Sequence, residues 1–276
     1  MTKQEGKNMS EKMEILVLNN EINILKDKLA QKMVLRDHIQ LHVCPNLDTD
    51  YILKFGGLNY EVYNYQVECE KIKMRISLME KQLNRESQIN LIEIDNYVDK
   101  KFAKKDDYLK EMSAKFNVVK NHGLKKELKG EEFKKLNKEY KDALLILHPD
   151  LTDYFDLTIE NFLFTAIEAY EDYDKQGIKS VKIMALNTNH TPQKEKSSEE
   201  LREFIDTLNI RIKLINKELI EIKESYPFNK KEFLSNENSV KSYKIKLTEE
   251  KENYMEEFSH YENIEHDILD KSHIIY

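Results

Sequence analysis

The sequence is poor in the residues that build tight turns and disulfides. Its 276 residues include six glycines, four prolines, two cysteines and no tryptophan. So few glycines and prolines leave little room for tight turns or phosphate-cradling loops, which disfavours a β-rich protein. Two cysteines, Cys44 and Cys69, cannot form a disulfide framework, and we expect both thiols to be reduced.

Long apolar runs are also missing. No stretch comes near the roughly 18 consecutive apolar residues that a membrane-spanning helix needs. The first residues, MTKQEGKNMSEKMEIL, lack the apolar segment of a secretory signal peptide. We therefore expect a soluble, cytoplasmic protein without a membrane segment.

Signatures of catalysis and of metal binding are absent as well. The sequence contains no G-x-G-x-x-G, P-loop, G-x-S-x-G or H-E-x-x-H motif, so we expect neither an enzyme nor a cofactor. His38, His42, Cys44 and Cys69 could meet around a metal only if the first long helices pair, and their spacing fits no zinc pattern. We expect these four side chains at buried or half-buried helix positions.

Charge, in contrast, is abundant. Charged residues make up 34% of the chain and hydrophobic residues 40%, a balance typical of long solvated helices with narrow apolar seams. The net charge of −7 argues against a general nucleic-acid binder. Residues 100–141 are locally basic, with 14 lysines against 7 acidic residues. They could face an acidic partner, or they could form a solvated helix face or complement the acidic arms of the same chain, which is the interpretation that we favour. Without interleaved exposed aromatic residues the case for nucleic acid is weak.

The C-terminal third carries the clearest periodicity. Its apolar residues step alternately by four and three, which predicts a coiled-coil helix: Leu201, Ile205, Leu208, Ile212, Ile215, Leu219 and Ile222. Pro227 breaks this helix, and a second amphipathic stretch follows over 240–268. We predict that residues 199–276 form an antiparallel helical hairpin.

Residues 1–124 predict a second region of long helices. A seam beginning at Ile15 runs to about Val43, and Pro45 is expected to end that helix. One further amphipathic stretch ends at about residue 85, and another covers about 91–119. The pair Gly56-Gly57 is either a hinge or a close helix contact, and the sequence leaves both interpretations open.

The segment 125–187 differs from both flanking regions in its helix start and stop signals, and a polar linker over 188–198 follows it. A helix after Gly130 ends on the tripeptide His148-Pro149-Asp150, because the residue before proline is pushed out of the α region. Thr158 is the expected cap of the next helix. The tripeptide is either a simple helix stop or a contact site.

This pattern resembles the J domain of Hsp70 co-chaperones. FKKLNKEYKDALLILHPDL is similar to the family's second helix with its HPD motif, and FLFTAIEAYEDYD is similar to its third helix. The resemblance implies that His148, Pro149 and Asp150 engage an Hsp70-type chaperone and stimulate its ATPase. It also assigns steering charges to Lys134, Lys135, Lys138 and Lys141.

The chain departs from the family beside the motif. Ile146 and Leu147 stand where a basic and an aromatic residue are usual, and Leu151 stands where lysine is common. Such apolar neighbours predict that one side of the motif is buried against a helical arm. The segments HVCPNLDTDYILKFGGLNYEVYNYQ and YPFNKKEFL extend the resemblance to a little-characterised group of bacterial J-domain-containing (DnaJ-like) proteins with helical flanks.

The sequence therefore predicts an elongated all-α protein in which long coiled-coil hairpins flank a small J-domain-like module. The leading functional prediction is a co-chaperone or adaptor whose arms bind a client protein or form a homo-oligomer. The alternative is a structural scaffold with a degenerate J-like module, such as an accessory subunit of a larger complex.

Overall fold

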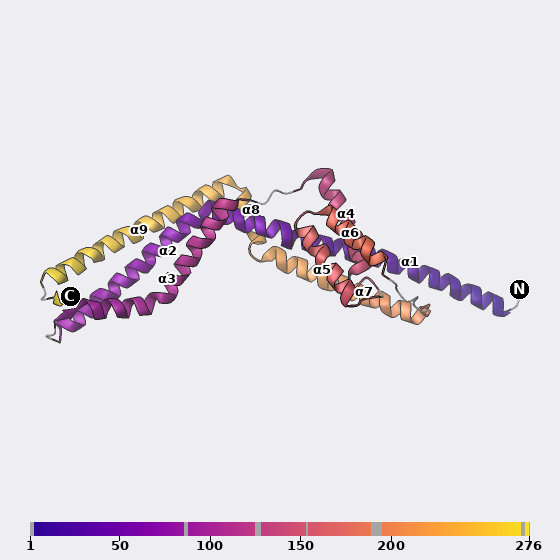
Figure 1. Ribbon diagram of the computed structural model, residues 1–276, viewed down its shortest axis with the longest axis horizontal. Coiled ribbons are helices and arrows are strands. Elements are labelled where there is room, and N and C mark those ends of the chain that lie inside the picture. Colours follow the sequence, from indigo (N-terminus) through magenta and orange to yellow (C-terminus); the bar gives the residue numbers. More distant parts are fainter. Residues whose placement is uncertain are drawn as a thin grey trace. The chain divides into compact units, whose positions relative to one another are not determined.

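The fold was described from a computed structural model of the chain (Figure 1). It describes residues 3–85, 88–124, 128–152, 154–188, 195–271 and 274–275. Helices account for nearly all of these residues, which confirms the predicted all-α fold. Two short strands, β1 (Ile89–Asn90) and β2 (Ile274–Ile275), pair in parallel. Most of the predicted linker, from 189 to 194, lies outside the described residues.

The chain divides into two compact units, and each combines two separate stretches of sequence. Unit 1 consists of residues 1–45 and 126–229, and unit 2 consists of residues 46–125 and 230–276. The predicted boundary between 124 and 125 lies within one residue of this division. The other predicted boundaries do not coincide with it, because each unit joins a part of the N-terminal region to a part of the C-terminal region.

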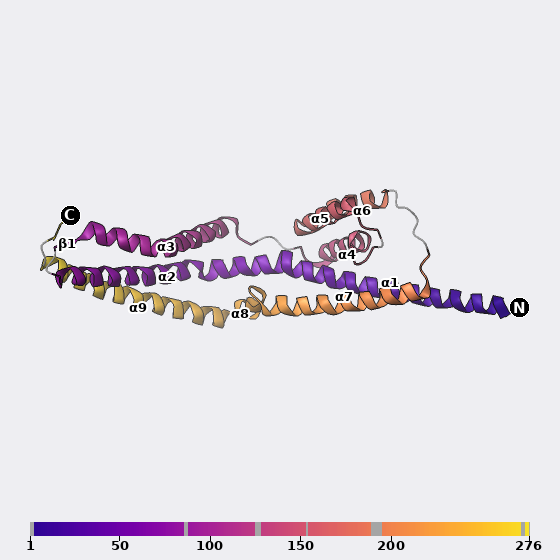
Figure 2. The ribbon, with the colours of Figure 1, turned by 90° about the horizontal axis from the view of Figure 1, so that it is seen from below.

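Two long helices run side by side in unit 1, α1 (Lys3–His38) and α7 (Ser198–Glu224) (Figures 1 and 2). Ion pairs from Glu14 to Arg202 and from Arg36 to Glu218 join them at two levels, so the helices point in the same direction. Six residues of the predicted seam of α7 are buried: Leu201, Ile205, Leu208, Ile212, Ile215 and Leu219. The seam packs on α1 and not on the amphipathic stretch that follows it, because heptads specify an apolar surface and not its partner.

Three shorter helices complete unit 1. They are α4 (Gly130–Leu147), α5 (Leu157–Glu171) and α6 (Lys175–Leu186), which contact one another, while α4 also contacts α1. The stacked rings of Tyr140 and Tyr170, with centroids 4.0 Å apart, fill the space between α4 and α5. Asp156 and not Thr158 caps α5, since its side chain accepts a hydrogen bond from the Ile159 amide.

Pro45 does not end the first helix, contrary to the sequence-based expectation. A π-helical turn, η1 (Ile39–Val43), follows α1, and α2 (Cys44–Leu83) begins directly after it. In a regular α-helix the proline ring would clash with the carbonyl four residues earlier. The wider π turn in front of Pro45 accommodates the ring and lets the chain stay helical.

In unit 2, α2 lies beside α3 (Leu91–His122) and α9 (Glu237–Asp270), with the short helix α8 (Lys231–Ser235) before α9 (Figure 1). One apolar cluster joins α2 and α3, and another joins Phe55 and Val62 of α2 to Leu247 of α9. A Cβ atom placed on Gly56 would lie 2.9 Å from Cδ2 of Phe116. The glycine pair therefore marks a close contact between α2 and α3.

Candidate functional site

The His-Pro-Asp tripeptide forms a closed turn at the end of α4. His148 is extended (φ −81°, ψ 131°), yet its amide still donates to the Leu144 carbonyl. The His148 carbonyl accepts hydrogen bonds from the amides of Leu151 at 2.9 Å and Thr152 at 3.0 Å. Its Nδ1 atom accepts from the Asp150 amide at 3.2 Å, which places the proton of the neutral ring on Nε2. The turn is thus fixed by its own backbone.

Two leucines fasten the turn to the core of unit 1. Leu147 and Leu151, on either side of the tripeptide, are 0% and 1% exposed. Both belong to the cluster that contains apolar residues of α1 and α7. Their burial gives a physical reason for the apolar residues that stand beside the motif in this sequence, since the turn rests on long helices of its own chain.

The three motif residues differ in accessibility. Pro149 is exposed, whereas His148 and Asp150 are half-buried. The Asp150 carboxylate lies 3.1 Å from Nε of Arg211 on α7, with 24% of the Asp150 side chain and 49% of the Arg211 side chain exposed. A partner can therefore reach Pro149 directly, but it must share or replace the Arg211 contact to bind the Asp150 carboxylate.

The environment of His148 favours its neutral form. Burial of the ring lowers the pKa of His148, the nearby Asp150 carboxylate opposes this effect, and the Arg36 guanidinium adds to it. Because removal from water penalises the charged imidazolium, the turn contains a neutral histidine near neutral pH.

The four lysines that the resemblance singled out fall into two groups on α4. Lys134, Lys135 and Lys138 are exposed, and Lys134 pairs with Glu131 at 2.8 Å. Lys141 is half-buried and pairs with Asp27 of α1 at 2.6 Å. Beside it, a cavity of about 240 Å³ lies between α1 and α4. Lys134, Lys135 and Lys138 thus form an accessible basic surface on α4. Lys141, the lysine nearest the turn, is instead neutralised by Asp27.

A buried polar network holds α4 on α1. The Tyr140 hydroxyl donates to Oδ2 of Asp37 at 2.7 Å, and Arg36 Nε lies 2.7 Å from the other carboxylate oxygen. Asp37 is 5% exposed and Tyr140 is 0% exposed. Burial beside the carboxylate raises the pKa of Tyr140 far above its usual value, so the phenol is a permanent donor. Asp37 was not predicted from the sequence, since nothing in its local pattern distinguishes it from a solvated acid.

His42 makes a second anchor from the π turn. It is 3% exposed, its Nε2 atom lies 3.0 Å from the Tyr170 carbonyl, and its ring stacks on Tyr173 with centroids 4.2 Å apart. His38 contacts it through the two Nδ1 atoms, 3.3 Å apart. The π turn therefore aims His42 at the end of α5, and the two anchors together orient the helices that carry the turn.

The remaining candidate metal ligands are separated by the fold. Cys44 is half-buried and lies in unit 1, whereas the buried Cys69 lies in unit 2 and contacts the Tyr254 carbonyl. Burial raises the pKa of both thiols. Within the described residues, no three His, Cys, Asp or Glu side chains are grouped to hold a metal ion.

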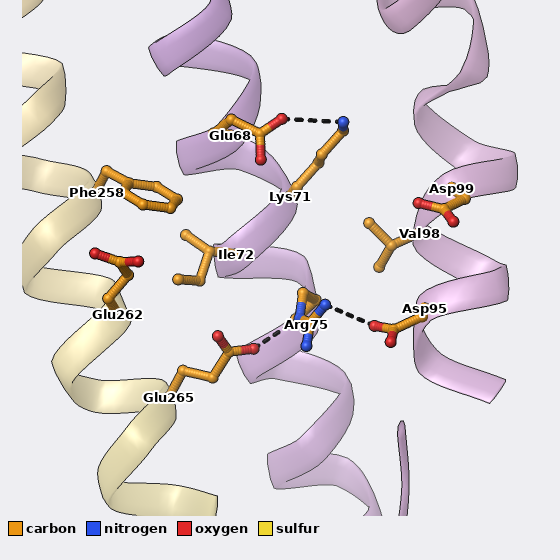
Figure 3. Close-up of a pocket in the computed structure, with 10 residues that line it drawn as sticks. All are labelled: Glu68, Lys71, Ile72, Arg75, Asp95, Val98, Asp99, Phe258, Glu262 and Glu265. Carbon is orange, nitrogen blue, oxygen red and sulfur yellow. Dashed lines mark hydrogen bonds and ion pairs between the residues drawn. The ribbon is translucent and has the colours of Figure 1, made fainter. Parts of the chain in front are cut away.

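Unit 2 contains a charged cavity of about 410 Å³ between α2, α3 and α9 (Figure 3). Arg75 of α2 points into it and pairs with Asp95 of α3 at 2.6 Å and with Glu265 of α9 at 2.7 Å. On the same side, Lys71 pairs with Glu68 at 3.1 Å and with Asp106 at 2.7 Å. Both cations are already held by carboxylates, so this cavity is an interhelical ion-pair network.

Comparisons of the chain with family models, with curated proteins and with solved structures find no match. Across the described ranges, no helix is both long and apolar enough to cross a membrane.

Proposed function

We propose that the chain is a cytoplasmic J-domain-type co-chaperone or adaptor that engages an Hsp70-type chaperone through the His148-Pro149-Asp150 turn and stimulates its ATPase. One observation carries the proposal. Pro149 is exposed at the C-terminal end of α4, and Lys134, Lys135 and Lys138 are exposed farther back along the same helix. An exposed basic helix face steers an acidic partner surface, and a rigid turn offers it a defined contact.

The long helices serve as the second functional part of this proposal. They recruit a client protein or set the oligomeric state, while the chain itself performs no chemistry. Binding is accompanied by an exchange of ion pairs, because Asp150 and Lys141 are paired with Arg211 and Asp27 in the free protein.

The test is steady-state ATP hydrolysis by a bacterial Hsp70 in the presence of the full chain. We expect stimulation by the wild type and its loss with Asp150→Asn. The matched control is Asp206→Asn, which removes one exposed carboxylate elsewhere in unit 1 and should stimulate like the wild type. Equal activity of the two variants would contradict a role for the turn.

A structural scaffold is the second candidate, favoured by the burial of Leu147 and Leu151 against the long helices. In that case the turn contributes only to stability. A double-mutant cycle of Asp150→Asn and Arg211→Ala, read out by urea unfolding, would then show coupling between the two residues. Coupling together with no effect of the wild type on the ATPase would favour the scaffold.

A further inference from the structure

Helix α3 carries a second basic surface, in unit 2, that the proposed function does not use. Tyr97 and Tyr108 are 52% and 50% exposed, and Lys100, Lys101 and Lys104 between them are exposed as well. Residues 97, 101, 104 and 108 follow one another at intervals of four and three, which places them on one side of a helix. Lys100 lies three positions after Tyr97 and four before Lys104, and so belongs to the same side. We call Tyr97, Lys100, Lys101, Lys104 and Tyr108 the lysine–tyrosine face.

The three lysines of this face are available to a ligand. Lys100, Lys101 and Lys104 make no hydrogen bond or ion pair with any described residue, whereas Lys105 beside them is held by Glu70. Of the nearest acidic residues, Asp106 pairs with Lys71 at 2.7 Å and Asp107 pairs with Lys110 at 3.0 Å, while Asp99 lies on the side of α3 that lines the cavity of Figure 3. The face is therefore locally positive although the whole chain has a net charge of −7.

The two tyrosines supply flat surfaces at either end of the lysines. Tyr108 is braced edge-on by Tyr63 of α2, with ring centroids 5.3 Å apart and planes at 89°. Tyr108 follows Tyr97 by eleven positions along the helix, a rise of about 16 Å. An array of aromatic rings and cations fits single-stranded nucleic acid, whose bases stack on the rings while lysines contact phosphates.

We propose that the lysine–tyrosine face of α3 binds single-stranded nucleic acid without sequence preference. From the sequence alone nucleic acid was disfavoured, because no exposed aromatic residues could be recognised among the lysines. In the structure Tyr97 and Tyr108 are such residues. A lipid surface is disfavoured because the exposed side chains over 96–108, all within the described residues, include no aliphatic residue larger than alanine. The proposal does not depend on the His-Pro-Asp turn.

The test is fluorescence anisotropy with the full chain and labelled oligouridylate and oligothymidylate of about 20 nucleotides. We expect both to bind at low salt, with log K falling against log salt with a slope of about −2 for three phosphate contacts. The triple change Lys100→Gln, Lys101→Gln and Lys104→Gln should weaken binding at least about tenfold.

A matched control comes from the same unit. Lys241, Lys244 and Lys246 of α9 are also exposed, and their triple change to Gln removes the same charge. It should weaken binding less than about threefold, because a diffuse field contributes less than direct phosphate contacts. Equal losses for the two triple variants would overturn the proposal, and so would an absence of binding at low salt.

The aromatic contribution is tested at Tyr97, which has an exposed ring. Tyr97→Ala should weaken oligonucleotide binding at least about fivefold, while Tyr97→Phe should bind like the wild type because the stacking surface remains. Competition by inorganic polyphosphate or poly-glutamate as strong as by oligonucleotide would show a site for polyanions or acidic proteins, and would overturn the assignment. Circular dichroism of each variant confirms that its helices are intact.

Discussion

Asp150 takes part in two interactions. Its amide donates to His148 Nδ1 within the turn, and its carboxylate pairs with Arg211 of α7. Under the proposed function, a chaperone partner that binds the Asp150 carboxylate must first compete with Arg211. A half-exposed ion pair of this kind contributes about 0.2–1 kcal/mol. We expect Arg211→Ala to lower the concentration of the chain that half-maximally stimulates the Hsp70 ATPase, by up to about fivefold.

The control for this prediction is Lys213→Ala, which removes a neighbouring exposed cation of α7. It should leave the half-maximal concentration unchanged if the effect of Arg211 comes from its contact with Asp150. An unaltered value for Arg211→Ala would show that the pair does not limit access to the turn.

His148 links the stability of unit 1 to pH. Its pKa in the folded chain lies below the ordinary value of 6.5 because the ring is buried. As pH falls below about 6.5, the unfolded chain takes up the proton first, so the free energy of unfolding decreases until the folded-state pKa is passed. The contribution is fully present above the unfolded-state pKa and is lost on acidification.

The measurement is urea unfolding of the wild type and of His148→Asn between pH 5 and pH 7.5. Asn places its side-chain oxygen close to the position of Nδ1, so it can still accept the Asp150 amide hydrogen bond, and it carries no titrating group. We expect the wild type to lose stability relative to the variant as pH falls through the window below about 6.5, with a constant difference above it. A difference that stays the same at every pH would contradict the assignment.

At the scale of helices, the two glycines of α2 differ in how closely α3 approaches them. A Cβ atom on Gly56 would lie 2.9 Å from Phe116 and 3.1 Å from Ile52, whereas one on Gly57 would lie 3.5 Å from Phe116. Gly57→Ala should therefore stabilise unit 2 by about 0.5–1 kcal/mol through helix propensity. We expect Gly56→Ala to lose this gain because it forces the Phe116 ring to move.

Thermal unfolding of the two alanine variants measures this contrast directly. In a Phe116→Leu background, Gly56→Ala should change the melting temperature more favourably than it does in the wild type. The smaller leucine side chain leaves room for the new methyl group. Equal melting temperatures for Gly56→Ala and Gly57→Ala would contradict the close approach of the Phe116 ring to Gly56.

The helices themselves follow from the sequence, but their partners do not. The heptad residues of α7 and the stop at His148 are readable because local spacing and proline chemistry determine them. The pairing of α7 with α1 is a property of distant segments, and so are the contacts of Asp150 with Arg211 and of Tyr140 with Asp37. Pro45 shows the opposite error, in which a local rule was overridden by the π turn before it.

At the scale of the whole molecule, each unit is built from two stretches that are separated in the sequence. Truncation after Asn229 removes α8 and α9, and with them Leu234 and Leu247 from the cluster that contains Phe55 and Val62 of α2. We expect unit 2 to lose its fold and unit 1, which needs no residue beyond 229, to keep it.

Amide NMR spectra of the full and truncated chains distinguish these outcomes. Signals of unit 1, such as that of Leu208, should keep their positions, while signals of α3 should collapse to unfolded values. A loss of helicity limited to the removed residues would mean that α2 and α3 are stable together without α9.

The split arrangement of unit 1 also has a consequence during biosynthesis. The seam of α1 is covered by α7, which begins at Ser198, so it leaves the ribosome long before its partner exists. At about 5–20 residues per second, the nascent α1 waits roughly 10–30 s with its apolar side uncovered. A freshly made chain of this protein therefore presents a long unpaired hydrophobic helix, and its own folding is a point at which it would need protection from aggregation.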